Sequence, residues 1–317
     1  MKPMNHLKSI FLASALILGI SITAHAEINV VSSVKPLHSL VSGVMEGVAR
    51  PDLIVKGSAS PHTYSLRPSQ ARQLEDADLV FWMGHELESF LEQPLEAIAT
   101  KGHIVELIDS SKLKKIKMRE GGMFDAHAHD DHDEHEGHDD HGHGEFDVHV
   151  WLDPENAKVL VDEIKLALIE LDPVNSSKYE SNSNKMNMKL DQLIDEVSKK
   201  LESEQGKGYV VFHDAYQYFE QRFGMSAVGS ITVSPEVVPG ANRIRELKNK
   251  INELNAHCVF SEPQFEPKLV STVIEGTQAN TGVLDPLGAS IKDGPELYFT
   301  LILNMADSLQ ECLSKKD

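Results

Sequence analysis

Histidines and carboxylates crowd one stretch of the sequence, from Gly121 to Asp147, which contains no lysine or arginine. Imidazole nitrogens and carboxylate oxygens are both good ligands for divalent cations of borderline hardness. The stretch has few large apolar residues, so we expect a disordered loop that binds metal loosely, as an accessory site. Its seven histidines are His127, His129, His132, His135, His138, His141 and His143.

Four other residues are candidates for a tight metal site: His62, His149, His213 and Asp285. Three of them follow short apolar runs that we interpret as strands, and His149 opens a segment that leads into a predicted helix. In open α/β sheets, ligands bind beyond the carboxyl ends of strands, so residues far apart in sequence can converge there. We therefore predict that these side chains clamp one cation between two lobes.

The elements that must position these residues alternate between strands and helices. Helical patterns follow most of the predicted strands, which indicates parallel sheets. Apolar residues from Met186 to Leu201 recur on one face of a long helix that Gly206 ends. The sequence thus predicts an α/β fold of two lobes, each a parallel sheet flanked by helices, joined by a long rigid helix. The predicted strands are residues 28–31, 52–55, 78–83, 209–212, 258–260 and 282–284.

The first residues have the pattern of a secretory signal peptide. Lys2 and Lys8 accompany an apolar run from Ile10 to Ile22, and Ala24-His25-Ala26 is a small-x-small cleavage pattern. The sequence therefore predicts a signal peptide at 1–26, an N-terminal lobe at 27–172 that includes the histidine-rich loop at 121–147, a linking helix at 173–206 and a C-terminal lobe at 207–317.

Charge and cysteine content restrict the environment and the partners. The formal net charge of -19 argues against a nucleic acid or an anionic membrane surface, because both require a positive face. No later run approaches the roughly 18 apolar residues of a membrane helix, and no cysteine near the cleavage site offers a lipid anchor. We expect a soluble periplasmic protein. In that oxidising compartment, Cys258 and Cys312, the only cysteines, are predicted to form a disulfide.

Five segments resemble the periplasmic zinc-binding proteins of ABC importers, the ZnuA family. The resemblance covers nearly the whole mature chain in order, including the histidine-rich insertion and the cysteine pair. The segments are PHTYSLRPS (61–69), DVHVWLDP (147–154), VFHDAY (211–216), FSEPQF (260–265) and LDPLG (284–288).

The resemblance implies a fold of the cluster A-I solute-binding type, with Zn2+ held between the lobes by His62, His149 and His213. Pro61 stands where family members often carry a glutamate that approaches the metal, so the fourth position falls to Asp285 or to a water. The partner would be the membrane permease of a zinc ABC importer, and we expect a monomer.

Other functions are alternatives to zinc capture. Manganese-type relatives replace the third histidine by a carboxylate, so His213 favours zinc over a manganese- or iron-binding homologue. A zinc-dependent adhesin is a further alternative. We expect no enzyme, because the sequence has no His-Glu-x-x-His, Gly-x-Ser-x-Gly or glycine-rich phosphate motif.

Overall fold

A computed structural model describes residues 28–99, 101–119, 124, 145–232, 240–254, 256–265 and 267–315. The predicted signal peptide lies outside these residues. So does the histidine-rich loop, with the exception of Phe124 and residues 145–147.

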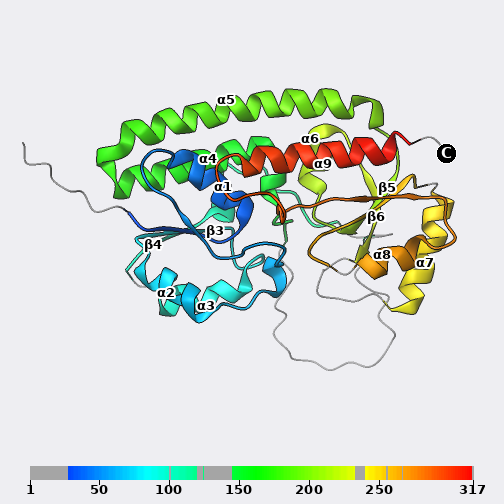
Figure 1. The fold of residues 1–317 in the computed structure, drawn as a ribbon, viewed down its shortest axis with the longest axis horizontal. Coiled ribbons are helices and arrows are strands. Elements are labelled where there is room, and N and C mark those ends of the chain that lie inside the picture. Colours follow the sequence, from blue (N-terminus) through cyan, green and yellow to red (C-terminus); the bar gives the residue numbers. More distant parts are fainter. Residues whose placement is uncertain are drawn as a thin grey trace, which may run out of the picture.

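Two parallel sheets of four strands each form the framework of the protein (Figure 1). The strand order is β2-β1-β3-β4 in the first sheet and β6-β5-β7-β8 in the second. The predicted fold class is confirmed, although β4 and β6 were not predicted. The strands are β1 (Val30–Ser32), β2 (Asp52–Leu53), β3 (Leu79–Trp82), β4 (His103–Glu106), β5 (Tyr209–His213), β6 (Ala227–Thr232), β7 (Cys258–Ser261) and β8 (Asn280–Val283).

Helices cover both faces of the two sheets (Figure 1). Helices α1, α4, α5 and α9 lie together on one side, α2 and α3 lie on the other side of the first sheet, and α7 and α8 lie on the other side of the second. The helices are α1 (Lys35–Val44), α2 (Pro68–Asp76), α3 (Ser89–Ala97), α4 (Pro154–Leu171), α5 (Ser176–Leu201), α6 (Gln217–Phe223), α7 (Ala241–Glu253), α8 (Pro267–Ile274) and α9 (Leu297–Leu313).

Helix α5 is the long helix that the apolar periodicity predicted. Its 26 residues extend about 39 Å at 1.5 Å per residue, and it runs past both sheets while packing on α4 and α9 (Figure 1). A short 3-10 turn and Gly206, at φ 80°, end it. None of the helices in the described part of the chain is long and apolar enough to cross a membrane.

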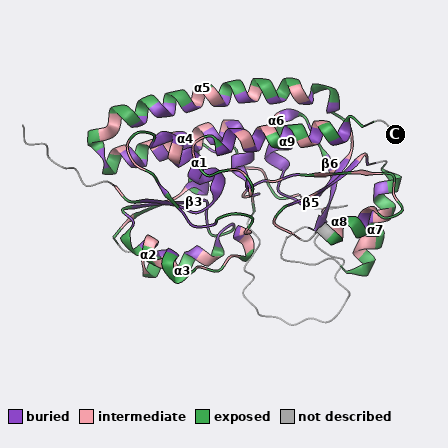
Figure 2. Cartoon of the chain, viewed as in Figure 1, coloured by how far each residue is buried: buried purple, intermediate pink, exposed green. Residues whose placement is uncertain are grey.

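Besides a smaller cluster that includes side chains of α7 and α8, one large apolar core connects the two sheets. Buried side chains form one continuous cluster from Phe81 of β3, through Leu160 of α4 and Leu190 of α5, to Tyr209 of β5 and Leu309 of α9 (Figure 2). The predicted disulfide between Cys258 and Cys312 is confirmed and ties β7 to α9. Because both sheets share this core, a large rotation of one against the other would separate packed apolar surface.

Candidate metal centre

Three histidines from three distant segments converge between the sheets. His213 is the last residue of β5, so it points beyond the carboxyl end of the second sheet. His62 lies in a 3-10 turn, Pro61–Thr63, between β2 and α2, and His149 immediately precedes the turn Val150–Leu152 that leads into α4. Asp153 caps α4 by accepting a hydrogen bond from the Glu155 backbone N–H at 2.9 Å, which fixes where this helix starts.

The spacing of the three rings suits one tetrahedral cation. One ligand nitrogen from each ring lies within 4.8 Å of the other two, and the Nε2 atoms of His149 and His213 are 3.5 Å apart. Metal–nitrogen bonds of about 2.05 Å at tetrahedral angles place ligand nitrogens about 3.3 Å apart. The pair formed by His149 and His213 is thus already near the required separation, and the His62 nitrogen is at most about 1.5 Å further away than a shared ion requires.

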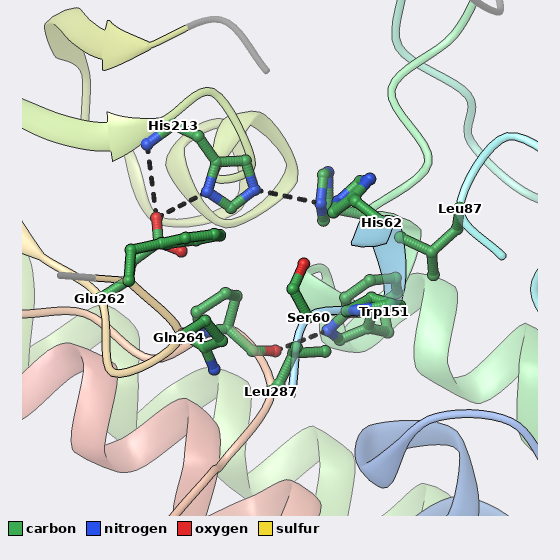
Figure 3. Close-up of a pocket in the computed structure, with 12 residues that line it drawn as sticks. Ser60, His62, Leu87, Trp151, His213, Glu262, Gln264 and Leu287 are labelled. Atoms are coloured by element: carbon green, nitrogen blue, oxygen red, sulfur yellow. Dashed lines mark hydrogen bonds and ion pairs between the residues drawn. The ribbon is translucent and has the colours of Figure 1, made fainter. Parts of the chain in front are cut away.

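The rings line a small, partly open cavity. Its volume of about 10 Å³ is close to the room that one water or one ion needs. His149 and His213 are 6% and 4% exposed, while His62 is half-buried. Figure 3 shows His213 facing His62 across this space, with Ser60 and Gln264 also on its wall.

Buried carboxylates hold two of the three rings. The Nδ1–H of His149 donates to Asp147 Oδ1 at 2.7 Å, and the Nδ1–H of His213 donates to Glu262 Oε1 at 2.7 Å (Figure 3 shows the second pair). Each bond fixes the tautomer that leaves Nε2 free as a metal ligand. In the part of the chain that the structure describes, the ring of His62 contacts the other two rings but has no carboxylate partner.

Burial and mutual repulsion keep two rings neutral. Burial, reinforced by His213, lowers the pKa of His149 to about 3, and burial together with the other two rings places the pKa of His62 well below 6.5. Burial also acts to lower the pKa of His213, but Glu262 outweighs it and raises that pKa above 6.5. Of the three rings, His213 is therefore the one at which a proton competes most with a metal ion.

A second layer of charge lies behind His149 and His213. Burial raises the pKa of Asp147 to about 7, against the opposing effect of the His149 backbone N–H. Arg119 donates to Asp214, next to His213, at 3.0 Å and to Glu220 at 2.8 Å. Asp214 and Glu262 belong to the segments 211–216 and 260–265 that carry the family resemblance, and of these two acids only Glu262 contacts a ligand ring. Asp147, which the sequence pattern placed at the end of the histidine-rich loop, was not predicted as a partner of His149.

Among the described residues, the group that could hold a metal ion consists of the three histidines and does not include Asp285. Its Oδ1 accepts backbone N–H bonds from Leu287 and Gly288 at 3.1 and 2.9 Å, and its Oδ2 accepts one from Ala289 at 2.6 Å. The carboxylate therefore closes a tight turn. The next two residues of that turn, Pro286 and Leu287, line the metal cavity.

Another buried carboxylate, that of Glu88, lies on the side of the site that the first sheet forms. It is fully buried, accepts the backbone N–H groups of Met83 and Gly84 at 3.0 Å each, and accepts the hydroxyl of Ser33. Burial raises its pKa to about 7 despite these bonds. Glu88 thus ties the ends of β1 and β3 together beside Leu87, which lines the cavity.

The comparisons of this chain with known proteins agree on one family. The profile of the family described as "Zinc-uptake complex component A periplasmic", ZnuA, matches residues 30–312. The "High-affinity zinc uptake system protein ZnuA" of Brucella suis biovar 1 is 51% identical over 98% of this chain and 100% of the relative, and that of Yersinia pestis is 37% identical over 97% and 98%. A crystal structure of ZnuA, 22% identical, superposes with a TM-score of 0.76 over 91% of this chain and 100% of the other.

Proposed function

Because the chain belongs to the ZnuA family of zinc-uptake components, we propose that it captures Zn2+ between its two sheets and delivers it to the membrane permease of an ABC importer. His62, His149 and His213 are the proposed ligands. Their convergence carries the proposal: three imidazoles from distant segments present nitrogen atoms within 4.8 Å of one another, in a space of the size of one ion.

The donor set supports zinc over a harder cation. Three neutral imidazoles suit tetrahedral zinc, whereas manganese prefers sites with more carboxylate oxygen. The carboxylates of Asp147 and Glu262 lie one ring further out, where they offset the charge of a dication without entering its coordination.

We assign the fourth position to a water rather than to Asp285. The hydroxyl of Ser60 and the Oε1 of Gln264 belong to residues that line the cavity, and both atoms are buried without a hydrogen-bond partner in the described residues. A metal-bound water needs such partners. Asp285, by contrast, uses both of its oxygens on backbone N–H groups.

The three ligands are proposed to act unequally during release. His149 and His213 remain fixed by Asp147 and Glu262, whereas His62 lacks such an anchor in the described part of the chain. A displacement of the His62 turn by an ångström or two breaks one metal bond and leaves the others in place. Release therefore does not require the wide opening that the shared core opposes.

The remaining features fit an exported carrier. We propose a periplasmic monomer, divided as the sequence analysis predicted, whose signal peptide at 1–26 is removed and which neither binds nucleic acid nor catalyses a reaction. The seven histidines between residues 127 and 143 are proposed as a weak accessory store of zinc. The negative charge of the chain agrees with a cationic cargo.

Zinc titration calorimetry tests the assignment with His62→Ala, His149→Ala and His213→Ala. Each should lose more affinity than the roughly 10–100-fold that loss of an outer partner costs. His103→Ala, at an exposed histidine of β4, is the matched control and should bind as the unaltered chain does. Deletion of residues 121–144, which keeps Asp147, should leave one tight site.

Tight binding that survives in all three ligand variants would refute the site. The carrier role further requires that circular dichroism show the same fold before and after zinc removal by a chelator, with full rebinding. A chain that unfolds when stripped would instead hold zinc as a structural element.

A further inference from the structure

The segment that follows β8 runs from the second sheet to α1 (Figure 1). Helix α9 then runs back toward the second sheet. We call residues 285–295 the crossing segment. Its start forms the turn closed by Asp285 and lines the metal cavity through Pro286 and Leu287. Its end meets α1, where the Ser39 hydroxyl donates to the Pro295 carbonyl at 3.2 Å. The same segment therefore contacts both the metal cavity and the N-terminal part of the chain.

Lys35, the first residue of α1, holds the middle of this segment. Its Nζ donates to the carbonyls of Ala289 and Ile291 at 3.2 and 2.8 Å and pairs with Asp293 at 3.1 Å. The side chain is only 5% exposed, whereas that of Asp293 is 44% exposed. A cation at a helix N-terminus opposes the helix dipole, and its burial costs desolvation. Among the described residues, the contacts that offset both costs all come from the crossing segment.

A short chain of contacts leads from Lys35 to the ligands. Ala289, whose carbonyl accepts from Lys35, also donates its N–H to Asp285. In the same turn, the carbonyl of Pro286 accepts from Trp151 Nε1 at 3.0 Å (Figure 3). The indole of Trp151 packs against the ring of His149, with centroids 5.3 Å apart. A shift of the crossing segment would therefore move the cavity wall. It would also move Trp151, which packs against His149.

We propose that Lys35 is a positioning residue that fixes the cavity wall and thereby slows zinc release. The proposal rests on the proposed function for its cargo, but the placement of the turn by Lys35 does not depend on metal. Loss of the Lys35 contacts would allow Pro286 and Leu287 to move. Such a substitution changes no metal ligand directly.

The test compares three variants of the full mature chain in two measurements. Lys35→Met keeps the buried stem and removes the charge. Asp293→Asn leaves the two carbonyl bonds in place and alters only the more exposed partner. Glu296→Gln is the control, because its exposed carboxylate pairs with Lys189 of α5 and lies outside the crossing segment. The measurements are zinc dissociation into excess chelator by stopped flow, and hydrogen exchange of the Leu287, Gly288 and Ala289 amides in metal-free protein.

We expect Lys35→Met to accelerate zinc dissociation about tenfold, which corresponds to about 1.4 kcal/mol, and to accelerate exchange of the three amides similarly. Asp293→Asn should accelerate both by a smaller factor, and Glu296→Gln should change neither. If Lys35→Met does not fold, Asp293→Asn decides the question.

Rates within twofold of the unaltered chain in the folded variants would overturn the proposal, even if Lys35→Met lowered the melting temperature, because Lys35 would then only stabilise the fold. A chain that takes up no zinc would overturn the proposed function instead. Amide exchange would still decide whether Lys35 positions the turn.

Discussion

Glu262→Gln is a sharp test of how the site tunes its affinity for zinc. The substitution keeps the shape of the side chain, and the amide oxygen can still accept the Nδ1–H of His213. Only the negative charge behind the ring is removed. Any change in affinity therefore reports the electrostatic contribution of Glu262 rather than a lost ligand or a collapsed cavity.

The geometry sets the size of the effect. A metal–nitrogen bond, the width of the ring and the 2.7 Å hydrogen bond place the carboxylate of Glu262 about 6.5 Å from the ion. At an effective dielectric constant of about 20, charges of -1 and +2 at that distance attract by about 5 kcal/mol. That figure is an upper bound, because the desolvation of both charges opposes it. We expect a 10–100-fold rise in the zinc Kd, about 1.4–2.8 kcal/mol.

Competition with a chelator of known affinity at neutral pH measures this Kd, and the melting temperature of the metal-free protein checks the fold. Glu106→Gln removes a partly exposed carboxylate at the end of β4 that contacts no metal ligand. It should change the Kd less than threefold. If Glu262→Gln also stays within threefold, the buried carboxylate does not strengthen His213 as a ligand, and the electrostatic argument fails.

Three further predictions concern stability and the turn at Asp285. Burial raises the pKa of Glu88 from 4.5 to about 7, so its protonated form adds stability at low pH that is lost as pH rises through 7. Between about pH 5.5 and about pH 8, urea unfolding should show a loss about 2 kcal/mol larger in the unaltered chain than in Glu88→Gln, because Asp147, with its pKa also raised to about 7, titrates in both. Asp285→Asn, which weakens the turn that forms the cavity wall, should lower the melting temperature and raise the zinc Kd by about tenfold at most, whereas a rise well beyond about 100-fold would make Asp285 a ligand. Replacing Cys258 and Cys312 by serine should cost about 4 kcal/mol in denaturant unfolding, with the zinc Kd unchanged, because the disulfide lies at the end of β7 remote from the site.

The strands that sequence patterns found are those with continuous apolar runs. The sequence Tyr209–Phe212 is buried throughout and was predicted, as β5 confirms. In contrast, β4 has His103 and Glu106 at its ends and lies exposed at a sheet edge, so no apolar run marks it. Strand β6 contains Gly229 and Ser230, which are poor strand formers, yet pairing with β5 and packing against the second sheet's core make it a strand. Tertiary contacts, which local patterns do not contain, decide such segments.

The metal centre was predictable to the extent that sheet topology determines it. A histidine after one parallel strand and a second polar residue after the neighbouring strand must lie side by side, because parallel strands end at the same edge. Strand β7 is the neighbour of β5, so Glu262, directly after β7, meets His213, the last residue of β5. The same rule fails for Asp285. It follows β8, one strand further out, and the turn at Pro286 directs its oxygens to backbone amides instead of the cavity. Strand order, rather than sequence spacing, thus separates the residues at the metal from those that shape the wall around it.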